Sequence, residues 1–198
     1  MKRIAATLFM LFQSSLCFAQ QPAAWKLPLD LNDENTSVRF DVDTTWHMVT
    51  GHISGTTGTV GLQDPGDISS IVADIHFPVK KFDTGWGMRD SSLYDHMAAE
   101  KFPEVRIQTS ALKGNCTPEL ASAGGCSGML EGQLTIRDVS KNVSLPVKIT
   151  KKGSNYLVSG KYTLRWAEYN VEDPSIMVAS VKPEVTISYS VTVPAGEN

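Results

Sequence analysis

Apolar and polar residues alternate with a period of two along most of this chain, and this pattern constrains the fold more than any other feature. The clearest run lies near the C-terminal end and consists of Val185, Ile187, Tyr189, Val191 and Val193. Successive side chains of a strand point to opposite faces of a sheet, so each run predicts a strand with one buried face. Further runs cover residues 38–42, 71–79, 105–107, 130–136, 143–149 and 162–166.

Turn-forming sequences separate these runs. They are Gly55-Thr56-Thr57-Gly58, Asp64-Pro65-Gly66-Asp67, Lys152-Gly153-Ser154-Asn155 and Asp173-Pro174. Short strands joined by such turns favour an all-β fold, an antiparallel barrel or a sandwich. One segment has helical spacing instead, because Leu93 and Met97 are four residues apart and Asp90 stands where it would cap the helix. We therefore expect one or two short helices beside the strands.

The first 19 residues predict a secretory signal peptide. Lys2 and Arg3 form a cationic start, residues 4–12 are apolar, and the small residue Ala19 precedes the expected cleavage point. A transmembrane anchor is the alternative, but the uninterrupted apolar stretch is too short to span ~30 Å of hydrocarbon. We expect export, with residues 20–198 forming a single domain.

Cleavage after Ala19 would leave two of the three cysteines, Cys116 and Cys126. In an oxidising compartment this pair predicts a disulfide that closes a loop rich in Gly, Ala and Ser. The net charge of −3 would become −5, because 16 basic and 21 acidic residues would remain. This balance excludes nucleic-acid binding driven by charge alone.

An ordered set of short motifs extends along the chain. It comprises Trp25, Ser37-Val38-Arg39-Phe40, Phe82-Asp83-Thr84-Gly85-Trp86-Gly87-Met88-Arg89-Asp90, Phe102-Pro103-Glu104-Val105, Gly132-Gln133-Leu134-Thr135-Ile136, Asp138-Val139-Ser140-Lys141-Asn142-Val143 and the closing strand 185–193. In order and spacing, this set closely resembles the YceI-like family of exported, lipocalin-like lipid-binding proteins. The resemblance covers about Trp25 to Val193, and Arg137-Asp138 departs from the family's polar residue followed by Gly.

The resemblance implies an antiparallel, lipocalin-like barrel of about eight strands around a long apolar channel, formed by residues 20–198 as one YceI-like domain. It also implies a periplasmic carrier without a cofactor, which holds an isoprenoid, a quinone or another long-chain amphiphile and performs no chemistry on it. On physical grounds, a barrel of about eight strands has room for its own side chains or for one ligand. A homodimer and a membrane donor or acceptor protein stay open as further partners.

The residues on the buried side of the alternation are candidates for ligand binding. They are Phe40, Val42, Trp46, Ile75, Phe77, Trp86, Met97, Phe102, Leu134, Leu145, Leu164 and Trp166. Alternation cannot separate a channel from a solid core, so an interaction module with a filled barrel is an alternative. Arg89 has two interpretations: it bonds nearby carbonyls or a carboxylate and fixes the lid of the barrel, or it meets the ligand's head group.

The alternative function is a small periplasmic hydrolase or metal-dependent enzyme that uses His47. Asp43, His47 and Ser54 could form a triad, but on one straight strand Asp43 and His47 would lie about 13 Å apart. Methionines near the four histidines could be soft ligands for copper. His47 and His52 are an odd number of residues apart, so on a straight strand they face opposite sides. We expect neither catalysis nor a metal site.

Overall fold

The computed structural model describes residues 25–65, 67–175 and 180–196. The predicted signal peptide and its cleavage point lie outside these residues. In this part of the chain, no helix has both the length and the apolar character needed to cross a bilayer.

One antiparallel sheet contains all eleven strands of the described residues. The nine longer strands are β2 (Thr36–Thr44), β3 (Met48–Ile53), β4 (Thr57–Leu62), β5 (Ile71–Pro78), β7 (Glu104–Lys113), β8 (Cys126–Ile136), β9 (Val139–Lys152), β10 (Asn155–Arg165) and β11 (Val181–Pro194). Two short strands are β1 (Leu29–Leu31) and β6 (Phe82–Asp83). The helices are α1 (Gly87–His96) and α2 (Pro118–Ala123), with 3-10 turns η1 (Ile68–Ser70), η2 (Val79–Lys81) and η3 (Trp166–Tyr169).

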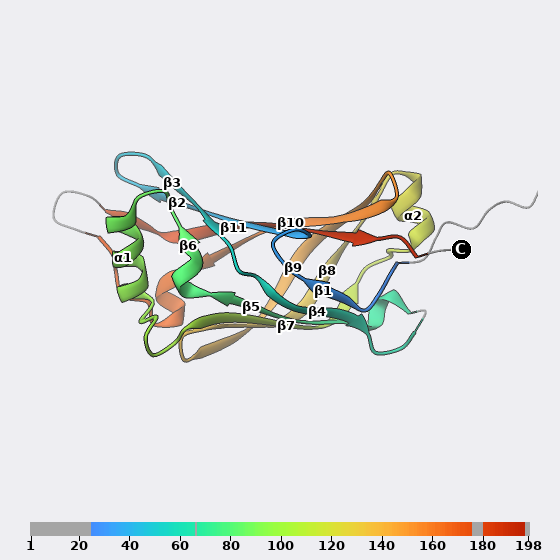
Figure 1. Ribbon diagram of the computed structural model, residues 1–198, viewed down its shortest axis with the longest axis horizontal. Helices are drawn as coiled ribbons and strands as arrows, with labels where there is room; N and C mark the ends of the chain where they lie inside the picture. Colours follow the sequence, from blue (N-terminus) through green and yellow to red (C-terminus); the bar gives the residue numbers. More distant parts are fainter. Residues whose placement is uncertain (1–24, 66, 176–179, 197–198) are drawn as a thin grey trace, which may run out of the picture.

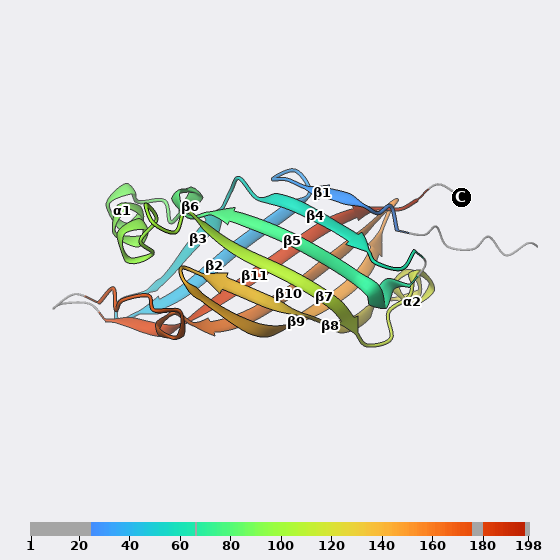
Figure 2. The ribbon, with the colours of Figure 1, turned by 90° about the horizontal axis from the view of Figure 1, so that it is seen from below.

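The strands follow the order β1-β4-β5-β7-β8-β9-β10-β11-β2-β3-β6, and the sheet curls around its own inner face (Figure 2). Helices α1 and α2 lie at opposite ends of the molecule (Figure 1). The predicted all-β antiparallel fold with short helices is thus confirmed, with eleven strands instead of about eight. The strands that no alternating run predicted are β1, β3, β4 and β6, which are short or rich in Gly and Thr and therefore carry little alternation.

The connection between β3 and β4 brings the two edges of the curled sheet together. β3 lies next to the edge strand β6, whereas β4 lies next to the other edge strand, β1. The carboxylate of Asp33 accepts the backbone N–H groups of Gly55 (2.8 Å) and Thr56 (3.1 Å) in this connection. The N–H of Ser54 donates to the carbonyl of Lys81 at 3.2 Å. These bonds hold the seam where the sheet meets itself.

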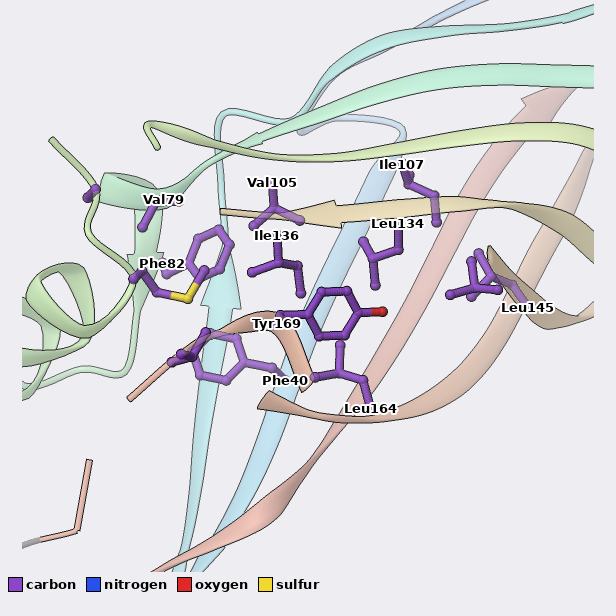
Figure 3. Packing of buried hydrophobic residues seen from close by; sticks show 14 residues of the cluster. Phe40, Val79, Phe82, Val105, Ile107, Leu134, Ile136, Leu145, Leu164 and Tyr169 are labelled. Carbon is purple, nitrogen blue, oxygen red and sulfur yellow. The ribbon is translucent and has the colours of Figure 1, made fainter. Parts of the chain in front are cut away.

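The buried side of the alternation forms two apolar clusters. The first lies at the α1 end, where Figure 3 shows the ring of Tyr169 among Leu134, Ile136 and Leu164. The second lies at the α2 end, where the ring of Trp25 stacks on that of Tyr156 with centroids 4.9 Å apart. The inner face of the sheet is therefore apolar from end to end.

The predicted disulfide is present at the α2 end. Cys116 and Cys126 are joined with an S–S distance of 2.02 Å, and both residues are buried. The loop that the bond closes contains α2, whose first turn is capped by the hydroxyl of Thr117 accepting the N–H of Leu120 at 3.3 Å. The bond therefore fixes a short helix against one end of the sheet.

Helix α1 begins earlier than the sequence predicts. Its first residue is Gly87, so Asp90 lies in the first turn and does not cap the helix. The buried carboxylate of Asp90 instead accepts the backbone N–H of Thr84 at 2.9 Å. Asp90 thus ties the helix to the segment that leads into it, and its predicted capping role is wrong.

Candidate ligand-binding cavity

The curled sheet encloses a cavity of about 630 Å³. Apolar side chains from most of the strands form its walls, and α1 contributes at one end (Figure 1). This volume is in the range of small-molecule sites, which are typically apolar and about 300–1,000 Å³. The barrel is therefore hollow, and the solid-core alternative does not describe it.

The candidate residues from the sequence fall along this cavity with one exception. Those that line it are Phe40, Val42, Trp46, Ile75, Phe77, Trp86, Arg89, Met97, Leu134, Leu145, Leu164 and Trp166. The exception is Phe102, whose ring lies 5.0 Å from the Lys101 ammonium and 5.7 Å from the Arg137 guanidinium carbon. Phe102 precedes β7 and is out of phase with the buried positions Val105 and Ile107, which explains the difference.

Several wall residues were not singled out from the sequence. Val158 and Tyr189 follow the same alternation as their predicted neighbours, so the pattern contained a signal for them. Trp25 and Leu27 also line the cavity, but they precede the first strand and belong to no alternating run. Met88 lies in the first turn of α1, and its place in the wall depends on where that helix begins.

Leu130 and Tyr189 mark the middle of the cavity. Both line it, and both contact the apolar cluster at the α1 end and the cluster at the α2 end. The hydroxyl of Tyr189 donates to the carbonyl of Pro146, and burial raises the pKa of Tyr189 to about 12. Gly160 is the cross-strand partner of Tyr189, and a Cβ there would lie 2.6 Å from the Tyr189 hydroxyl. The glycine lets this ring lie across β10.

The cavity opens at the end that carries α1. Trp46, Trp86 and Met88 line it there and are also largely exposed to solvent. The lining at this end also includes three polar side chains, those of His47 and of Ser92 and His96 in α1. This end combines an apolar opening with a few polar groups, an arrangement that suits an amphiphile whose polar end stays near water.

Arg89 forms a local hydrogen-bond network at this opening. Its Nε donates to the Thr84 hydroxyl at 2.8 Å and its Nη2 donates to the Thr84 carbonyl at 2.7 Å. Nearby, the Tyr94 hydroxyl donates to the Phe82 carbonyl at 2.9 Å, and burial, followed by the charge of Asp90, raises the pKa of Tyr94. Arg89 therefore has the structural contacts expected of it, while its side chain also reaches the cavity lining.

Arg137 contacts the C-terminal end of α1. It occupies the two-residue turn between β8 and β9 with a φ of 55°, a conformation that favours glycine. Its guanidinium donates to the carbonyls of His96, at 3.4 Å, and Asn170. The departure from the family's turn sequence thus supplies a side chain that ties the end of α1 to the β8–β9 turn.

The residues of the alternative enzyme lie on a hairpin and not on the straight strand that the distance argument assumed. A turn at 45–47 joins β2 to β3, and the Thr44 hydroxyl accepts the N–H of His47 at 3.2 Å. Asp43 forms an ion pair with Lys182, which lowers the pKa of Asp43. Across the described ranges, no group of three or more His, Cys, Asp or Glu side chains is placed to hold a metal ion.

The chain belongs to the YceI-like family, because the YceI-like domain matches residues 29–193. No curated protein matches it in sequence. Among solved structures, BcnA of Burkholderia cenocepacia is similar with a TM-score of 0.67 and 21% identity, over 79% of this chain and 95% of BcnA.

Two further structures share the fold at low identity. A polyisoprenoid binding domain from Saccharophagus degradans has a TM-score of 0.62 and 11% identity, over 81% of this chain and 94% of that domain. The Campylobacter jejuni YceI protein has a TM-score of 0.61 and 16% identity, over 75% of this chain and 86% of that protein. At these identities the likeness concerns the fold.

Proposed function

We propose that this protein is a periplasmic carrier that holds a long apolar or amphiphilic lipid, of the isoprenoid or quinone type, and does no chemistry on it. The observation that carries the proposal is the apolar cavity of about 630 Å³ along the curled sheet. The similar domain from Saccharophagus degradans, which is a polyisoprenoid binding domain, supports this ligand class.

The size of the cavity suits a chain-like lipid. An apolar cavity of roughly 150 Å³ accommodates one benzene ring, so about 630 Å³ corresponds to on the order of 25 carbon atoms. Each Å² of apolar ligand surface removed from water contributes ~25 cal/mol, and the walls offer few polar groups that would have to be matched. A branched hydrocarbon tail therefore meets the chemistry of this cavity better than a polar metabolite.

Two features support the location. The first 19 residues have the sequence of a secretory signal peptide, and the Cys116–Cys126 disulfide is typical of an oxidising compartment. Cell fractionation together with N-terminal sequencing tests this part of the proposal. Recovery in the cytoplasm of a chain that still begins at Met1 would contradict it.

Identification of a co-purified lipid tests the binding function. The protein is purified without harsh detergent, extracted with organic solvent and analysed by mass spectrometry, and a stoichiometric lipid is expected. Emptied protein is then titrated with prenyl quinones, which should quench the fluorescence of Trp residues in the cavity wall. Protein that is repeatedly empty and also takes up no prenyl quinone would overturn the carrier function.

A further inference from the structure

Exposed apolar side chains gather at one end of the molecule. In the described part of the chain, the large apolar side chains on the surface are Trp46 (70% exposed), Met48 (60%), Trp86 (56%), Met88 (74%) and Leu120 (40%). Leu120 belongs to α2, at the opposite end from α1 (Figure 1). We refer to the other four, Trp46, Met48, Trp86 and Met88, as the mouth rim. Exposed apolar patches of this kind mark sites of contact with proteins or membranes.

The mouth rim surrounds the opening of the cavity. Its members come from the β2–β3 hairpin and from the segment that begins α1, and Figure 1 shows both at the same end. Trp46, Trp86 and Met88 also line the cavity, so the apolar surface continues from the outside into the interior. Met48 belongs to the rim but does not line the cavity.

Two charged side chains near the rim, Asp43 and Arg89, have partners within the protein. Asp43, the cross-strand partner of Met48, forms an ion pair with Lys182. The guanidinium of Arg89 donates to the hydroxyl and the carbonyl of Thr84. The Asp43–Lys182 pair carries no net charge, and the Arg89 guanidinium is held by Thr84 and lies 5.7 Å from the centre of the Trp86 ring. Apolar side chains therefore dominate the rim, which complements a surface without net charge better than a strongly charged one.

We infer that the mouth rim docks on the surface of a zwitterionic phospholipid bilayer, so that the lipid cargo passes between the bilayer and the cavity. Indole rings favour the membrane–water interface because they combine an apolar body with an N–H donor. Methionine side chains adapt to an irregular apolar environment. The inference rests on the proposed function for the identity of the cargo, and it adds the surface at which the cargo is exchanged.

Sedimentation with phosphatidylcholine vesicles tests the docking. Met48→Ser shortens a rim side chain without changing the cavity wall, and Leu120→Ser is the matched control at the α2 end. The wild type and Leu120→Ser should sediment with the vesicles equally, and Met48→Ser about three- to tenfold less, as expected for one partly buried side chain. Binding should persist in high salt, because no net charge drives it.

Transfer experiments separate this inference from the proposed function. Met48→Ser should take up a prenyl quinone from detergent micelles like the wild type, but should load several-fold more slowly from vesicles. A wild type that takes up no quinone from micelles would refute the carrier function, while the sedimentation experiment would still test docking.

Three results would overturn the docking inference. The first is equal vesicle binding by Met48→Ser and the wild type. The second is binding that requires anionic lipid. The third combines two observations: the wild type does not bind vesicles, and it forms a dimer in analytical ultracentrifugation that the change Met48→Ser dissociates. A second copy of the chain would then be the occupant of the rim.

Discussion

The middle of the cavity offers a direct test of how the ligand lies. Leu130 is half-buried, lines the cavity and has Leu112 and Leu145 as its cross-strand partners on either side. Because it contacts the apolar clusters of both ends, the change Leu130→Trp would place a bulky ring across the mid-point. A ligand that enters from the α1 end would then lose the half of the cavity near α2.

The expected loss depends on the length of the ligand. Half of about 630 Å³ is the space of roughly two benzene rings, or about 12 carbon atoms. Displacing even one isoprene unit of about five carbons costs up to ~4 kcal/mol at ~0.8 kcal/mol per carbon, which is on the order of a thousandfold in Kd. A ligand short enough to lie between the opening and Leu130 should lose little affinity.

The assay is a titration of the wild type and Leu130→Trp with prenyl quinones of increasing tail length. The control is Leu130→Met, which approximately conserves volume and should bind every quinone like the wild type. Thermal unfolding separates a blocked cavity from a damaged fold, because overpacking alone costs about 1–3 kcal/mol of stability. Equal losses for short and long tails, or no loss for either, would refute the lengthwise placement of the ligand.

Three further changes test the scaffold. Replacing Cys116 and Cys126 by Ser should lower the free energy of unfolding in denaturant by about 3 kcal/mol, as expected for a loop with a sequence separation of 10; an unchanged midpoint would show that the loop is equally ordered without the bond. Gly160→Ala should destabilise the fold by at least about 2 kcal/mol, because its Cβ would lie 1.9 Å from the Pro146 carbonyl oxygen; a wild-type melting temperature would contradict this close approach. Burial raises the pKa of Tyr169 from 10.0 to about 12, so its contribution to stability is complete below pH 10 and is lost as the pH rises toward 12. Tyr169→Phe should therefore lose less thermal stability than the wild type between pH 10 and 12, and identical alkaline profiles would argue against the raised pKa.

The period-two alternation predicted the long strands because one face of each of those strands is mostly apolar. In β9, for example, Val143, Leu145, Val147 and Ile149 are all buried, and the residues between them are not. The short strands β3 and β4 escaped the prediction because glycine and threonine interrupt their alternation. The cavity wall was predictable for the same reason as the strands. The hollow interior was not, since the same residues of the alternation point inward whether the barrel holds a channel or a solid core.

The sequence signals for two turns at the α1 end are weak, since the β2–β3 turn has no typical turn residue and the β8–β9 turn has only Asp138. The β2–β3 turn is stabilised by the Thr44 hydroxyl, which accepts the N–H groups of Trp46 and His47, and it contains no Gly, Pro or Asn. In the β8–β9 turn, Arg137 adopts a φ of 55° where glycine is the usual choice. In both places side-chain hydrogen bonds replace the intrinsic turn preference, and a local sequence pattern does not reveal them.

The ends of the sheet order have a consequence for how copies of this protein behave at high concentration. A long unpaired edge strand is a template on which another chain can add its own strand, and this is a route to β-aggregation. Here the edge strands β1 and β6 are only three and two residues long, and the carboxylate of Asp33 takes up two N–H groups where the edges meet. Because β6 pairs only with His52 and Ile53 of β3, the free backbone on that side of the sheet is the short stretch Met48–Gly51. Growth into fibrils would have to begin on such short stretches and not on a long continuous edge.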